Sequence, residues 1–230
     1  EGPRVAFVRD RDFDFDPPLD EKVELTEITD TRFPEPLGWY WSRHEIENYL
    51  LDPAIIQLVW PSVSRHDYES MLVKAAVKIR FYEAARWAVG IARRALPPHY
   101  ELRTRPAELC DRELAVPAWF DMERCQQWAV ACIGEHCNRL TECLSVCTAV
   151  DVIERMSDHL AVHECSDCKK ILTWFSGKDL LCALAPEIER VFNRVPGSFR
   201  ARIRDWIMQH PEEAVRALPP WDTLRGYVRQ

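Results

Sequence analysis

The chain has 230 residues, of which 47% are hydrophobic and 29% are charged, as in an ordinary soluble globular protein. Its net charge of −7 argues against a protein that coats nucleic acid through a basic surface, but not against an acidic site that acts on nucleic acid. No apolar run is long enough to cross a bilayer and no signal peptide opens the chain. We therefore expect a cytoplasmic protein without a membrane partner.

The first predicted element is a short strand that ends in carboxylates. Residues 5–8 form an unbroken apolar run with β-branched ends, which is typical of a strand buried on both faces. Asp10, Asp12 and Asp14 follow at alternate positions. Alternate residues of an extended chain point the same way, so Asp10 and Asp12 can converge on one cation, with Mg²⁺ or Mn²⁺ as the usual partner of such oxygen ligands. The alternative is a polar turn whose acids face water.

Two more strands are expected over residues 22–28 and 38–41, and a helix over 43–51. Ser42 has the chemistry of its N-cap, and Glu45 three residues on completes a capping box. Glu47 borders the apolar face of this helix, in its first turns, where it can reach a metal at the strand end. Alternatively, Glu47 is a solvated acid that the helix dipole favours.

The middle of the chain carries helical patterns. A short helix is expected over residues 54–60 and a long one over 64–96, with Asp67 three residues after a capping Ser64. The basic residues of the long helix either form a solvated face or hold a phosphate backbone. Two further helices are expected over 121–132 and 139–160, with a break near Gly134. This region reads as a helical insertion after an α/β start.

The nine cysteines do not have the spacing of a disulfide framework, and we expect them to be reduced and mostly buried. Cys165 and Cys168 form a lone CxxC pair with His163 just before it. Zinc requires two more ligands, which His136, Cys137 or Cys182 could supply by folding back. The sequence leaves zinc binding open.

Near the C-terminal end, Gly177 and Lys178 stand at an expected helix start within Ser-Gly-Lys-Asp-Leu-Leu. Backbone N–H groups and an ammonium at such a place can meet a phosphate, although the glycine spacing is not that of a Walker A loop. The alternative is a surface lysine. Helices are expected over 180–192 and 199–210, followed by a tail over 219–230.

Three segments together resemble Toprim nucleases related to the overcoming-lysogenization-defect (OLD) family. Val-Arg-Asp-Arg-Asp-Phe-Asp at 8–14 resembles the DxD strand end of a Toprim domain, and residues 43–51 resemble its "IENYLL" helix. Residues 176–181 resemble the downstream "GKDLL" segment. The resemblance implies an α/β fold: a Toprim-like (Rossmann-like) sheet with a large helical insertion and C-terminal helices. Residues 1–55 would form part of the Toprim core, 56–170 the helical insertion, and 171–230 the GKDLL segment and the C-terminal helices that complete the domain.

The same resemblance implies a metal-dependent endonuclease in anti-phage defence, of the OLD-like or PARIS type. It assigns Asp10, Asp12 and Glu47 as ligands of Mg²⁺ or Mn²⁺, and Lys178 as the residue that balances charge at the scissile phosphate. The implied partners are DNA or an RNA such as tRNA, and an ABC-type ATPase on the same or another chain; we also expect an oligomer.

One feature departs from the Toprim pattern. A Toprim domain carries a catalytic glutamate and a helix before its DxD strand, and the residues before Asp10 leave no room for them. We expect that first unit upstream of Glu1. The alternative function is a non-catalytic Toprim-like module that regulates or adapts an ATPase partner or binds a phage trigger.

Overall fold

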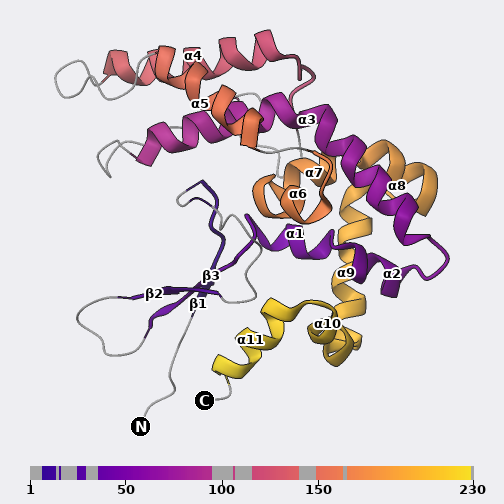
Figure 1. Cartoon of the computed structure of the whole chain (residues 1–230). Coiled ribbons are helices and arrows are strands. Elements are labelled where there is room, and N and C mark those ends of the chain that lie inside the picture. Colours follow the sequence, from indigo (N-terminus) through magenta and orange to yellow (C-terminus); the bar gives the residue numbers. More distant parts are fainter. Residues whose placement is uncertain are drawn as a thin grey trace.

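A small sheet and a large helical part make this a mixed α/β chain (Figure 1). The computed structural model describes residues 7–13, 16, 25–29, 36–94, 106, 116–139, 149–162 and 165–228. The sheet contains β1 (Phe7–Arg9), β2 (Thr26–Ile28) and β3 (Gly38–Tyr40) in the order β1-β3-β2. β1 runs parallel to β3, and β2 runs antiparallel to it. Because parallel strands end at the same sheet edge, Asp10 after β1 lies beside residues 41–45 after β3.

The expectation that the first strand is buried on both faces is wrong for the part that the structure describes. Phe7 is 46% exposed and Arg9 is also exposed, since β1 lies at the edge of the described sheet. An apolar run of this length does not tell a central strand from an edge strand. Residues 5 and 6 of that run lie outside the described residues.

The helix expected over 43–51 is shorter, and its cap is different. α1 spans Ile46–Leu50 with Glu45, not Ser42, as its N-cap, and the Glu45 N–H donates to the Asn48 side chain at 2.8 Å. The Ser42 hydroxyl instead lies 2.8 Å from the Tyr49 hydroxyl inside the core. Asp52 then caps α2 (Pro53–Val59), so the predicted end of the first helix is also the start of the second.

The long helix is present as α3 (Arg65–Arg94), and its predicted cap is confirmed because the Asp67 N–H donates to Ser64 Oγ at 3.1 Å. The second half of α3 packs against α4 (Met122–Arg139) and α5 (Ala149–Val162) in a separate apolar cluster that includes Val89, Ala129 and Met156. The break expected near Gly134 is wrong, because α4 runs through it. One glycine costs a helix only about 1 kcal/mol, which the packing of α4 outweighs.

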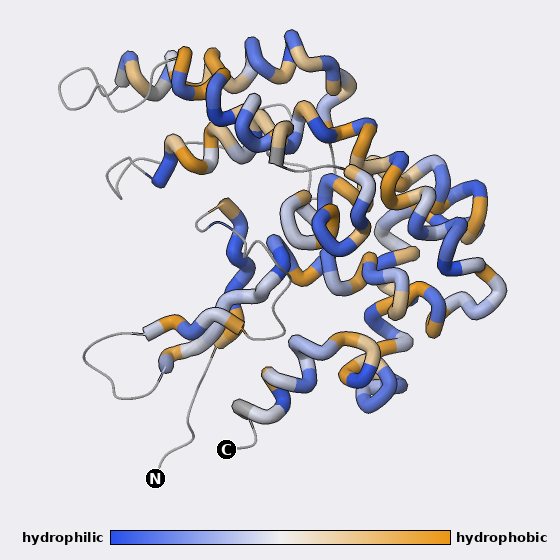
Figure 2. Tube along the Cα trace, in the orientation of Figure 1, coloured by the Kyte–Doolittle hydropathy of each residue, from blue (hydrophilic) through white to orange (hydrophobic). Residues whose placement is uncertain are grey.

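The rest of the chain is helical: α6 (Cys168–Trp174), α7 (Gly177–Ala183), α8 (Ala185–Phe192), α9 (Pro196–Gln209), α10 (Pro211–Ala217) and α11 (Pro219–Val228). The tail expected over 219–230 is therefore wrong up to Val228, since proline is well suited to the first turn of a helix. Apolar and polar residues are interspersed along these helices (Figure 2). Apolar residues such as Phe199 and Ile203 of α9 are buried in the main core together with Leu72 of α3. None of the described helices is both long and apolar enough to cross a membrane.

Candidate functional site

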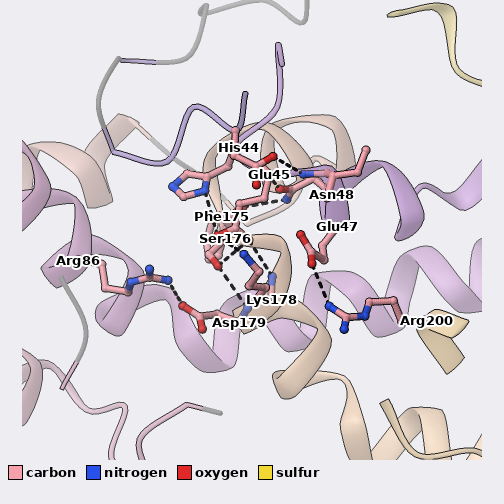
Figure 3. Close-up of polar contacts among 12 residues, drawn as sticks. His44, Glu45, Glu47, Asn48, Arg86, Phe175, Ser176, Lys178, Asp179 and Arg200 are labelled. Carbon is pink, nitrogen blue, oxygen red and sulfur yellow. Dashed lines mark hydrogen bonds and ion pairs between the residues drawn. The ribbon is translucent and has the colours of Figure 1, made fainter. Parts of the chain in front are cut away.

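The carboxylate of Glu45 joins two helix starts that are distant in sequence. Its Oε2 accepts the Ser176 hydroxyl at 3.2 Å and the Lys178 backbone N–H, 133 positions downstream, at 3.1 Å (Figure 3). The Lys178 ammonium lies 3.7 Å from Oε1. Glu45 is only 3% exposed. Burial alone would raise its pKa, but the nearby positive groups (His44 when protonated, Lys178 and Arg86) shift the pKa downward.

The turn before α7 fits against α1 because it has no side chain at the contact. A Cβ on Gly177 would lie 2.6 Å from the Asn48 backbone nitrogen and 2.7 Å from Glu47 Cβ. Ser176 caps α7 by accepting the Asp179 N–H at 3.3 Å, and Asn48 donates from its amide to the Phe175 carbonyl at 2.9 Å. Glycine at this point therefore lets the Lys178 segment approach the acidic helix start.

Asp10 lies at the end of β1 and is bound to the start of α1. Its Oδ1 accepts the Ile46 N–H at 3.0 Å. The pKa of Asp10 is raised from 3.8 to about 6, mainly by burial and also by the charges of Glu45 and Asp12, while the Ile46 hydrogen bond and Lys178 oppose part of the shift. Such a shift indicates a carboxylate for which burial and two neighbouring acids together outweigh the nearby positive and hydrogen-bonding groups.

Asp12 lies in the turn after β1 and in a backbone conformation that few residues adopt. Its φ is 48°, in the left-handed region, which aspartate tolerates better than most non-glycine residues. The N–H groups of Arg11 and Asp12 both donate to the His44 carbonyl, at 3.1 and 3.2 Å. One carboxylate oxygen each from Asp12 and Glu45 and one ring nitrogen of His44 lie within 4.8 Å of one another.

Glu47 has one oxygen paired and one without a hydrogen bond. Its Oε1 accepts from Arg200 of α9 at 3.0 Å, and among the described residues no group hydrogen-bonds its buried Oε2. The side chain is 6% exposed. Leaving a buried carboxylate oxygen unsatisfied is costly, and a cation would relieve that cost.

Lys178 brings the sequence-predicted residues into one electrostatic environment. Burial lowers its pKa, but the charges of Glu45, Glu47, Asp10 and Asp12 raise it, and the net shift is upward. Its side chain remains 32% exposed. An ammonium in this position can be reached by a ligand from solvent.

Sequence reasoning missed three members of this site: His44, Glu45 and Arg200. Glu45 entered only as a presumed capping-box partner of Ser42, and His44 was read as part of a helix that starts two residues later. Arg200 is one of several arginines on α9, and nothing in the sequence distinguishes the one that faces Glu47. A second acid within two positions of Glu47 was the only available signal.

A second buried network supports α7 from the side of α3. The Arg86 guanidinium is hydrogen-bonded to Asp179, and Glu83 accepts the Ser176 N–H at 3.1 Å. Burial and the charge of Asp179 raise the pKa of Glu83 well above its usual range. The Arg86 guanidinium also lies 4.7 Å from the Phe13 ring centroid, which connects this network to the turn after β1.

Two other features lie apart from the acidic cluster. A cavity of about 850 Å³ is lined by residues such as Arg43, Arg65 and Cys168, but by none of the predicted site residues.

Cys168 also belongs to the CxxC pair with Cys165. Within the described residues no third His, Cys, Asp or Glu ligand joins this pair, and His163 lies outside those residues. Burial raises the pKa of Cys168 to about 11, which disfavours the thiolate that zinc needs. None of the six cysteines in the described part of the chain forms a disulfide.

Within the described residues, one carboxylate oxygen each of Asp12 and Glu45 and one ring nitrogen of His44 lie close enough to hold a divalent cation together, whereas the nearby Lys178 ammonium is suited to an anion. In the comparisons with known proteins, no family model, curated protein or solved structure matches the chain. The hard oxygen donors, the unsatisfied Glu47 oxygen and the raised pKa of Asp10 all fit a divalent ion.

Proposed function

We propose that the protein is a divalent-metal-dependent endonuclease that hydrolyses phosphodiester bonds at this acidic site. The observation that carries the proposal is the position of Lys178. Its ammonium lies 3.7 Å from Glu45 Oε1, and carboxylates after β1 and at the start of α1, more than 100 positions earlier, raise its pKa. Carboxylates with a nearby, partly exposed lysine are suited to bind a metal and an anionic substrate together.

In this proposal each residue has a separate task. Asp10, Asp12 and Glu47 would hold Mg²⁺ or Mn²⁺, and such an ion would supply Lewis-acid chemistry that activates water and stabilises the leaving oxygen. Lys178 meets the scissile phosphate and offsets the negative charge that develops on it. Glu45 positions Lys178 by binding both its backbone N–H and its ammonium.

The wider setting rests on the Toprim resemblance. By that resemblance the substrate is DNA or an RNA such as tRNA, the partner is an ABC-type ATPase, and the context is OLD-like or PARIS-type anti-phage defence in the cytoplasm. The resemblance also implies a Toprim fold, an oligomer and a further catalytic glutamate upstream of Glu1. The mixed α/β class with a large helical part is compatible with that fold.

One contact favours the alternative, a non-catalytic module that regulates or adapts an ATPase partner. Arg200 already supplies Glu47 with a positive charge at 3.0 Å, which is what a degenerate site that no longer binds metal would need. Such a module would keep its fold, and any binding to nucleic acid, after Glu47 or Asp10 is neutralised.

The decisive experiment compares Lys178→Met with Lys170→Met, an exposed lysine on α6 that serves as the matched control. The protein is assayed with the upstream segment that the Toprim resemblance implies, on DNA and on tRNA, with EDTA and with Mg²⁺ or Mn²⁺. We expect cleavage only with metal, and a loss of about 10²–10³-fold in Lys178→Met but not in the control.

Binding of nucleic acid, measured in parallel with Ca²⁺ in place of Mg²⁺, should weaken far less than cleavage in Lys178→Met. Equal losses of cleavage and of nucleic-acid binding would mean that Lys178 contacts the phosphate backbone without acting in the reaction. Cleavage at the wild-type rate by Asp10→Asn or Asp12→Asn would exclude the nuclease, and metal-independent binding without any cleavage would favour the adaptor.

A further inference from the structure

We propose that Asp12, His44 and Glu45 form a binding site for a first-row transition-metal ion, with one imidazole and two carboxylates as ligands. Their ligand atoms lie within 4.8 Å of one another. Metal–ligand bonds of about 2.0–2.2 Å place neighbouring ligand atoms about 3–3.5 Å apart, so the cluster must contract by about 1 Å. His44 Nδ1 and Glu45 Oε1 are already 3.8 Å apart.

The imidazole of His44 is the independent observation that points to a ligand. The residue is 0% exposed, and among the described residues no group hydrogen-bonds either of its ring nitrogens. A buried histidine in a protein core normally donates or accepts at least one hydrogen bond. Here one nitrogen instead faces two carboxylates, the arrangement in which a metal ion supplies the missing partner.

The chain holds these three ligands in place before any ion binds. Two backbone hydrogen bonds from Arg11 and Asp12 to the His44 carbonyl join the turn after β1 to the segment after β3. The imidazole ring packs edge-on against Phe13, with centroids 4.6 Å apart, and against Trp87 at 5.7 Å. Because the ring cannot turn without disturbing both contacts, the imidazole is held in its orientation before any ion binds.

The donor set also limits which ion fits. Mg²⁺ and Ca²⁺ prefer oxygen ligands alone, whereas an imidazole with two carboxylates suits Mn²⁺, Fe²⁺, Co²⁺ or Zn²⁺. In the metal-free protein the Lys178 ammonium, 3.7 Å from Glu45 Oε1, supplies positive charge to the same carboxylate. An ion bound here would add a second positive charge beside the same carboxylate.

This inference deepens the proposed function, because the site shares Asp12 with the proposed nuclease centre, but its test reads coordination and not cleavage. Mn²⁺ is the probe, since it binds oxygen and nitrogen and disfavours the thiolates of Cys165 and Cys168. Equilibrium titration gives the Mn²⁺ affinity, and electron spin echo envelope modulation detects a nitrogen bonded to the bound Mn²⁺. His44→Phe keeps an aromatic ring at the packed position and removes both nitrogens.

We expect the wild-type complex to show ¹⁴N modulation from a coordinated imidazole. His44→Phe should abolish that signal and weaken Mn²⁺ binding at least about tenfold, while His159→Phe, a second buried histidine on α5, keeps both. His44→Gln replaces His44→Phe if circular dichroism shows that the phenylalanine variant does not fold.

A wild-type Mn²⁺ complex without ¹⁴N modulation would overturn the inference, and so would a signal that survives both His44 variants. The two proposals fail separately. Mg²⁺-dependent cleavage without imidazole coordination leaves the nuclease standing and removes this metal site. Imidazole-bound Mn²⁺ in a protein that cleaves no nucleic acid would support this metal site and remove the nuclease proposal.

Discussion

Replacing Asp10 by asparagine should stabilise the metal-free fold at neutral pH. The folded protein holds the Asp10 carboxylate near Glu45 and Asp12, and its pKa is about 6 against a reference value of 3.8. This difference corresponds to at most about 3 kcal/mol of destabilisation by the ionised form. Because the side chain is partly exposed, solvent screening reduces the figure to about 1–2 kcal/mol. Asparagine keeps the oxygen that accepts the Ile46 N–H and removes the charge.

The pH dependence of this gain has a defined sign. A carboxyl whose folded pKa is raised binds its proton more tightly in the folded state, so wild-type stability falls as the pH rises between about 4 and 6. Below that window Asp10 is protonated in both states, and the asparagine variant gains nothing. Above it the full gain of about 1–2 kcal/mol is expected.

Urea unfolding followed by circular dichroism at pH 4 and pH 8 measures this difference. The control is Asp205→Asn, an exposed acid paired with Arg204 at 3.0 Å, which should change stability by less than about 0.5 kcal/mol. Saturating Mn²⁺ should then stabilise the wild type more than Asp10→Asn, because the variant lacks a proposed ligand. A variant that is less stable than wild type at pH 8, or equally stabilised at both pH values, would refute the electrostatic account.

Two further predictions concern the support of α7. Gly177→Ala should lower the free energy of unfolding by about 1–3 kcal/mol, because its Cβ would meet the Asn48 backbone. Gly197→Ala is the control and should be neutral or stabilising, since its Cβ meets nothing within 4 Å. Thermal unfolding of both variants tests this prediction, and equal effects would contradict it. Arg86→Met should cost about 3–5 kcal/mol in the same assay at pH 7 because it leaves Asp179 buried without its cation, and a loss below about 1 kcal/mol would show that this ion pair contributes little.

The sequence predicted which elements carry the acidic and basic residues of the site better than it predicted the contacts between those elements. Local patterns were enough to predict that carboxylates follow the first strand, that Glu47 lies on the first helix and that a helix starts at Lys178. Each depends on residues within a few positions, which is the range over which capping and periodicity act. That Lys178 shares an environment with Asp10 followed only from the family resemblance, since no local pattern carries a contact across such a separation.

What the sequence could not provide depends on tertiary contacts. Ser42 is a better N-cap than Glu45 by intrinsic preference, yet its hydroxyl pairs with Tyr49 and the helix starts three residues later. The exposure of Phe7 depends on which strand takes the edge of the sheet, which an apolar run of four residues does not determine. Gly177 was read as a phosphate-binding glycine, but in the fold it also permits the close approach of α7 to α1.

The contact between α1 and α7 also bears on the order in which the protein folds. Glu45 and Lys178 are 133 positions apart, and Asn48 and Phe175 are 127 apart, so these bonds close long loops and bring a large entropic cost. The packing of α3 against α4 and α5 closes shorter loops and can form first. We therefore expect the acidic site to be assembled late, after the folding transition state. Substitutions at the α1–α7 contact would then act mainly on the unfolding rate and leave the folding rate nearly unchanged.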